Sequence, residues 1–286
     1  MTLDKHDNFE ACKMSIPYEM NSICVIDGQH RIFSYYEGNE NDKSERKISK
    51  LRKKLHLLVT GLIFPSTMGN LERLQIQSKI FLDINSNAKA VPPDVLLQIQ
   101  ELQNPFSDFG IARKVIYKLN RGSLFCDKFE MSTLDKGKIK IASIIKFALR
   151  YLVTIVPSDA KPSIYTYWTG NKDGIIAKDE KALDEYIEYI SKILEIYFKA
   201  IKKNNIEAWN DPGTNILSVT SINGYIIALT RQLPVNGIKD FLYYDSCFEK
   251  FSVDYSKGKF GYTSSQYRRF SNYILEKAFK IDIQKY

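Results

Sequence analysis

The residues of this sequence that could do chemistry stand in a row after a short apolar run. An acid, a glycine, an amide, an imidazole and a guanidinium follow one another as Asp27, Gly28, Gln29, His30 and Arg31. An apolar–polar pattern of helical type resumes directly afterwards, which places the string at a helix N-terminus, where backbone N–H groups favour an anion. The glycine lets a ligand approach the backbone, and the basic side chains can donate hydrogen bonds to a phosphate. The string therefore predicts a phosphate or nucleotide site.

The same string has a purely structural interpretation. Asp27 could cap the helix by accepting its first N–H groups, while Gly28 supplies the turn. Capping explains these two residues, but it does not explain why Gln29, His30 and Arg31 follow in a row. We therefore favour the ligand-site interpretation of the whole string.

A second polar loop, from Asn85 to Lys89, follows a later helical pattern. Asparagine tolerates left-handed backbone geometry and serine hydrogen-bonds locally, so the loop could simply cap the helix before it. The functional hypothesis is that Asn85, Asn87 or Lys89 faces the Gly28 turn and completes a polyanion or nucleotide pocket.

Basic and aromatic side chains interleave late in the sequence, at Tyr267, Arg268, Arg269 and Phe270. Such a string could hold phosphates and stack on bases. We prefer the structural interpretation, in which the two rings form the core face of a helix and the arginines are solvated. The sequence contains no Walker A, GxSxG or HExxH motif.

The elements that must position the first two motifs alternate between strands and helices. Apolar runs predict strands over 22–27 and 55–64, and the charged stretch over 39–54 predicts a solvated loop. Helical spacing predicts helices in the same part of the chain, over 31–37, 71–85 and 95–102.

After about residue 130 the pattern becomes helical. Amphipathic or apolar stretches predict long helices over 139–156, 179–203, 216–232 and 264–279. The expected organisation is an α/β domain over 1–130 followed by a mainly helical domain over 131–286.

Composition narrows the class of protein. The 286 residues carry a formal net charge of +8, which suits a polyanion such as DNA, although a Lys-rich composition also arises from a biased genome. No apolar stretch is long enough to span a bilayer, and the first residues do not form a secretory signal, so we expect a cytoplasmic protein without a membrane partner. The four cysteines and three histidines are scattered without the spacing of metal ligands, and no metal site is expected.

The two polar motifs resemble those of a known family. Residues 26–31, followed by residues 81–91, resemble the motifs of the DGQHR-domain family, and the likeness extends over roughly 16–103. That family includes DndB-like proteins encoded beside DNA phosphorothioation systems and DpdB-like proteins beside deazaguanine DNA modification. It is similar to the ParB/sulfiredoxin superfamily, so the resemblance implies an α/β (α+β) domain with a ParB/sulfiredoxin-like mixed sheet.

The resemblance also implies roles for residues. In the superfamily a strand–turn–helix element binds nucleotide phosphates, which implies that Gly28, Gln29, His30 and Arg31 line a nucleotide pocket, with Asn85 and Lys89 in a parallel role. Sulfiredoxins carry a reactive cysteine where this chain has Gln29, so thiol redox chemistry is not expected. Only 26 residues precede Asp27, fewer than in the family. Either the domain is a shortened version that lacks its first strands, or the start codon lies upstream.

Two functions of different classes follow. The first is a nucleotide-phosphate-binding, DNA-associated accessory or regulatory protein of a DNA-modification or phage-defence system, with DNA-modification proteins as partners. The alternative is a hydrolase or phosphoryl-transfer enzyme that uses ATP or another nucleoside triphosphate with Mg²⁺. There Arg31 would stabilise the transferring phosphate, and Asp27 or His30 would orient the nucleophile. A remnant that only folds is a third hypothesis.

Overall fold

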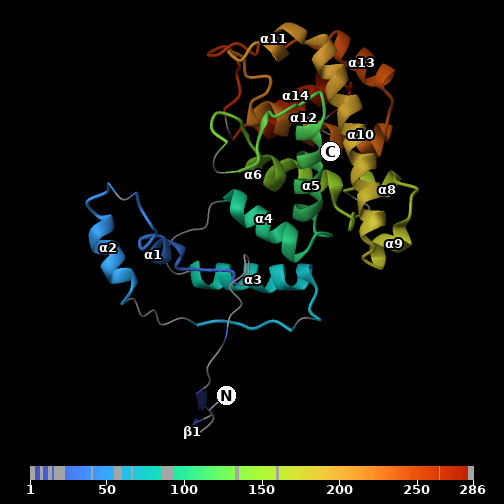
Figure 1. Ribbon diagram of the computed structural model, residues 1–286. Coiled ribbons are helices and arrows are strands. Elements are labelled where there is room, and N and C mark those ends of the chain that lie inside the picture. Colours follow the sequence, from blue (N-terminus) through green and yellow to red (C-terminus); the bar gives the residue numbers. More distant parts are fainter. Residues whose placement is uncertain are drawn as a thin grey trace. The chain divides into compact units, whose positions relative to one another are not determined.

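The computed structural model describes residues 4–6, 9–11, 15, 23–39, 41–54, 60–65, 67–85, 93–132, 135–158, 161–263 and 265–282. The chain divides into two compact units, Met1–Ala88 and Lys89–Tyr286 (Figure 1). The boundary that the sequence predicts near residue 130 marks the end of the expected first domain, and it stays a prediction.

The first unit contains short elements. Its strands β1 (Asp4–His6) and β2 (Phe9–Ala11) pair antiparallel. Three helices follow, namely α1 (Gln29–Phe33), α2 (Glu45–Arg52) and α3 (Asn70–Asn85). None of the described side chains of this unit is buried.

The expected α/β fold with a mixed sheet is wrong. The structure is 59% helix and 3% strand, and each sheet in the described residues has two strands of two or three residues. Residues 23–27, expected in a buried strand, form no strand, and Ile23 and Val25 are 62% and 42% exposed. A strand needs a neighbour to satisfy its backbone, and no described strand pairs with this run. The second expected strand, over 55–64, is not a strand at residues 60–64, and 55–59 lie outside the described residues.

The charged stretch over 39–54 is partly helical, contrary to the expected loop. Helix α2 is stabilised by its own ions, because Arg52 bonds both carboxylate oxygens of Glu45 at 2.8 and 3.0 Å. Ile48 and Leu51, three residues apart, fall on one side of this helix. The many charged residues of this stretch make its weak helical spacing difficult to recognise in the sequence.

The second unit is a bundle of helices. They are α4 (Pro93–Gln103), α5 (Asp108–Arg121), α6 (Ile141–Ile144), the π-helix η1 (Ile145–Leu149), α7 (Arg150–Val153), α8 (Ile164–Tyr167), α9 (Lys172–Ile176), α10 (Glu180–Asn204), α11 (Ile206–Asn210), α12 (Val219–Asn236), α13 (Phe241–Glu249) and α14 (Tyr267–Lys277). A two-residue parallel ladder joins β3 (Phe129–Glu130) to β4 (Ile139–Lys140). The helices expected over 71–85, 95–102, 179–203, 216–232 and 264–279 are confirmed with shifted ends. The one expected over 139–156 is interrupted by the π turn of η1.

The core of the second unit is aromatic. Tyr197 of α10 is fully buried, and its ring meets Tyr225, Tyr244, Phe248 and Phe279 with centroids 5.1 to 6.4 Å apart. The pairs with Tyr225 and Tyr244 are edge-to-face, and the pair with Phe279 is stacked. Such aromatic pairs add to the free energy of area burial, and each is worth roughly 0.5–1.5 kcal/mol. Because these rings come from four different segments, the cluster fixes the helices against one another.

Helices α12 and α14 lie side by side in this unit (Figure 1). Their contact is close because Gly224 of α12 faces the buried ring of Phe270 of α14. A Cβ added at Gly224 would overlap Cδ1 of that ring. None of the described helices is long and apolar enough to cross a membrane.

Gly224→Ala tests this packing, because two effects oppose each other. Helix propensity alone would stabilise the variant by up to about 1 kcal/mol. Overpacking against Phe270 costs roughly 1–3 kcal/mol, so we expect net destabilisation in urea unfolding. Gly261→Ala, where an added Cβ meets nothing within 4 Å, is the matched control and should unfold like the parent. A Gly224→Ala protein more stable than the parent would contradict this packing.

Candidate functional site

The expected ligand turn exists as a helix start. Gly28 is the N-cap of α1 with φ 83° and ψ 9°, the left-handed region that favours glycine. Its carbonyl accepts the N–H groups of Arg31 and Ile32 at 2.9 and 3.2 Å. The N–H groups of Gln29 and His30 donate to no described acceptor. The turn therefore presents two free backbone donors at the positive end of a short helix.

The side chains of the turn are exposed. Those of Asp27, Gln29, His30 and Arg31 make no hydrogen bond or ion pair with any described residue. A Cβ placed on Gly28 would lie 4.0 Å from Nε of Arg31, so the guanidinium folds back toward the turn. The capping interpretation of Asp27 is wrong, because Gly28 is the N-cap and no side chain caps this helix.

Helix α2 holds the segment that follows α1 through contacts that no pattern in the sequence indicates. Arg52 donates from Nε to the carbonyl of Tyr35 at 2.7 Å and from its second nitrogen to that of Tyr36 at 3.2 Å. Glu45 accepts the N–H of Gly38 at 2.8 Å. The hydrogen bond from Arg52 is the main cause that lowers the pKa of Glu45. This clamp fixes the C-terminal side of the short helix that carries the Gly28 turn.

The second expected motif lies partly outside the described residues. Asn87 and Lys89 lie outside the described residues. Asn85 is the last residue of α3, and its place there agrees with the expected helix end. The structure therefore brings together the Gly28, Gln29, His30 and Arg31 backbone, while the contribution of the second loop stays a prediction.

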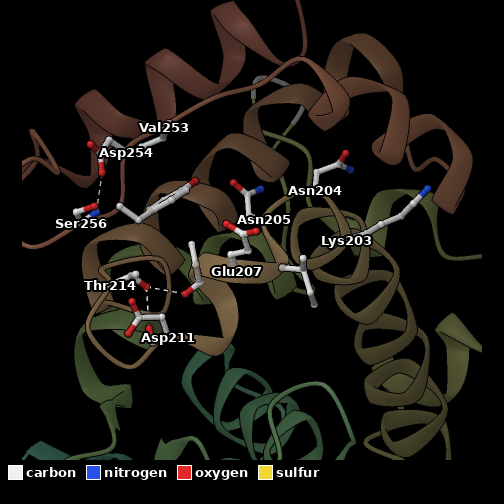
Figure 2. Close-up of a pocket in the computed structure, with 12 residues that line it drawn as sticks. Lys203, Asn204, Asn205, Glu207, Asp211, Thr214, Val253, Asp254 and Ser256 are labelled. Carbon is white, nitrogen blue, oxygen red and sulfur yellow. Dashed lines mark hydrogen bonds between the residues drawn. The ribbon is translucent and has the colours of Figure 1, made fainter.

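A pocket of about 570 Å³ lies in the helical unit, and the sequence had not indicated it. Figure 2 shows its lining at the ends of α10 and α11 and in the segment around residues 253–256. Two of its carboxylates are engaged within the protein, because Asp211 accepts the N–H of Gly213 at 2.6 Å and Asp254 that of Ser256 at 3.0 Å. The hydrogen bonds from Ser256 lower the pKa of Asp254. These negative groups do not favour a phosphate in this pocket.

At one edge of that pocket an ion pair joins α10 to α13. Lys203 donates from Nζ to Asp245 at 2.5 Å, and Asn204 donates from Nδ2 to the other carboxylate oxygen at 2.9 Å. The hydrogen bond from Lys203 is the main cause that lowers the pKa of Asp245. Among the described residues, no three His, Cys, Asp or Glu side chains are placed to hold a metal ion.

The lowered pKa of Asp245 predicts a pH-dependent contribution to stability. A carboxyl group whose pKa is lower in the folded chain stabilises it above the unfolded value of about 3.9 and loses this effect as the pH falls. We expect Asp245→Asn to lower the melting temperature at pH 7, with the difference from the parent shrinking below about pH 4. Asp184→Asn changes an exposed aspartate of α10 that forms no ion pair with a described residue, and it should have little effect. A difference for Asp245→Asn that does not change with pH would refute the ionic explanation.

Comparison with known proteins assigns neither unit to a family. Comparison with protein-family models, with curated proteins and with solved structures finds no match to this chain.

Proposed function

We propose that the chain is a nucleotide-phosphate-binding, DNA-associated accessory or regulatory protein. The observation that carries the proposal is the Gly28 turn, with its left-handed glycine, two N–H groups that have no acceptor among the described residues, and an arginine folded back toward it. The resemblance of the DGQHR string to proteins of DNA-modification systems supports a role in such a system or in phage defence.

The turn fits a phosphate in its chemistry. The free N–H groups of Gln29 and His30 are neutral donors, and the guanidinium of Arg31 supplies a charge-assisted donor. None of the first-turn residues of α1 is acidic. The carboxylate of Asp27 precedes the turn, and beside a polyphosphate it would add repulsion.

The charge distribution supports an association with DNA. The unit Met1–Ala88 has 12 Lys and Arg against 11 Asp and Glu, whereas Lys89–Tyr286 has 29 against 22. The helical unit therefore carries +7 of the formal charge of +8. An excess of this sign attracts the phosphate backbone of nucleic acids.

Arg31→Ala tests the phosphate site. We expect it to weaken the binding of labelled ATP, CTP or GTP, each with Mg²⁺, by roughly tenfold to a hundredfold, because a hydrogen bond to a charged group is worth about 1.5–3 kcal/mol. Fluorescence anisotropy of the nucleotide measures the affinity. Arg46→Ala removes an exposed arginine of α2 without an ion pair to a described residue, and it should leave the affinity unchanged.

Asp27→Asn sharpens the same experiment. If the turn holds phosphate directly, loss of the negative charge should leave the affinity unchanged or raise it. Equal affinity of the parent and Arg31→Ala, or no binding of any nucleotide to the parent, would contradict the proposed site.

A further inference from the structure

A second surface of basic and aromatic side chains lies in the helical unit, apart from the Gly28 turn. It gathers residues of η1, α7, α12 and α14, and we call it the stacking face. Its members are Lys146, Phe147, Arg150, Tyr151, Arg231, Tyr267 and Arg268.

Aromatic rings form the middle of this face. Phe147 of η1 stacks on Tyr267, the first residue of α14, with centroids 5.6 Å apart and an interplanar angle of 27°. Phe147 is 41% exposed, and Tyr151, four residues further along the helix, is 49% exposed. The next turn of α14 instead places Phe270 in the core with no exposed surface. The helix is therefore anchored by Phe270 in the core, while the partly exposed ring of Tyr267 supports the exposed ring of Phe147.

The π-helix helps to expose these rings. Residues 145–149 form a π turn between α6 and α7. Such turns are uncommon and occur often at functional sites. Ile145, Ala148 and Leu149 are buried, so the wide turn directs Lys146 and Phe147 outward.

Cations surround the rings. Nζ of Lys146 lies 5.4 Å from the centroid of Phe147, and the guanidinium of Arg150 lies 4.5 Å from that of Tyr151. Arg268 follows the stacked tyrosine in the helix.

No described carboxylate pairs with these cations. Burial, and then the neighbouring charge of Arg268, lower the pKa of Arg231. Arg231 donates to Asn272, a neutral acceptor. The ion pairs of the described residues include none of these four cations, Lys146, Arg150, Arg231 and Arg268. Elsewhere in the same unit lysines face carboxylates, as Lys203 faces Asp245. Arg268 and Asn272 are four residues apart on α14, so the hydrogen bond to Asn272 brings Arg231 to the side of this helix that carries Arg268. Two guanidinium groups on one side of a helix without a described counter-charge favour an anion beside them.

Packing alone does not account for the face. The rings of Phe147 and Tyr151 are exposed although the core lies directly beneath them, and Lys146 and Arg150 lie over these rings. Arg150 also lies over Phe109, which packs against the core, and donates a hydrogen bond to the hydroxyl of Tyr151. Bases stack on exposed aromatic rings, and phosphates pair with free arginines and lysines. The face offers both kinds of contact together.

We propose that the stacking face binds single-stranded DNA, with bases on Phe147, Tyr151 and Tyr267 and phosphates on the surrounding cations. A duplex keeps its bases stacked on one another, so the rings favour unpaired bases. The inference rests on the proposed association with DNA, but it uses no residue of the Gly28 turn.

The test is the affinity of the full chain for a fluorescein-labelled dT oligomer of 20 nucleotides, followed by anisotropy over a range of salt concentrations. We expect Tyr267→Leu, Phe147→Leu and Tyr151→Leu each to weaken binding about fivefold or more, without a change in the salt dependence. Tyr151 is half exposed, so its replacement leaves the core intact even if a change at Tyr267 disturbs folding. Circular dichroism reports on folding of each variant.

Arg268→Gln and Arg269→Gln form a matched pair, because they change the same charge at adjacent positions. Arg269 lines a separate small pocket with Lys259 and Tyr262, close to the carboxylate of Asp254. We expect Arg268→Gln to weaken binding and to reduce the slope of log affinity against log salt by about 0.7. Arg269→Gln should have a smaller effect on both.

Other ligands and one further variant separate the outcomes. Tighter binding of a DNA duplex or of an RNA oligomer, equal binding of an abasic oligomer, or equal losses in the two arginine variants would overturn the proposal. Arg31→Ala should bind the dT oligomer like the parent. Failure of the nucleotide site therefore appears as lost nucleotide binding with DNA binding kept, and failure of the stacking face appears as the reverse.

Discussion

The constraint on which the helical unit depends is the burial of several tyrosines in one core. Rings supply large apolar areas, but each buried hydroxyl needs a hydrogen-bond partner. Tyr197 donates to the carbonyl of Tyr225 at 3.1 Å, and Tyr186 donates to that of Val153 at 3.0 Å. The hydroxyls of Tyr225 and Tyr255 pair with one another. Burial raises the pKa of Tyr197 and Tyr225 well above the ordinary value, so both hydroxyls stay protonated and neutral.

This core also places the surface that we propose for DNA. The ring of Tyr225 on α12 meets Phe270 on α14 edge-to-face at 5.4 Å, and Gly224 lets the two helices come close. One turn before Phe270, the same helix begins with Tyr267, which reaches the exposed ring of Phe147. The arrangement of exposed rings is therefore a consequence of how the buried ones pack. The Gly28 turn depends on other features. Its glycine has a left-handed conformation, and the helix that follows it is held at its C-terminal side by the hydrogen bonds of Arg52 to Tyr35 and Glu45.

The sequence predicted the helical half well and the first half poorly, for physical reasons. Long amphipathic periods such as that of α10 specify a helix by themselves, because one face must be buried. The run before Asp27 is apolar but short, and such a run forms a strand only if a partner strand exists elsewhere. The left-handed turn at Gly28 follows from local chemistry and could be predicted. The stacking of Phe147 on Tyr267 joins residues 120 positions apart, and no local pattern indicates such a contact. For that reason the string at Tyr267 and Arg268 by itself indicates only a core face and solvated arginines.

The most direct test is to map which residues of the chain a bound nucleic acid contacts. A dT oligomer in which single thymines are replaced by 5-iodouracil can be irradiated on the full chain, and the crosslinked peptides identified by mass spectrometry. Photocrosslinking of this base requires close contact, and it is efficient with aromatic rings. We expect crosslinks at Phe147, Tyr151 or Tyr267. Crosslinks confined to Met1–Ala88, or to rings outside the stacking face such as Tyr117, would contradict it.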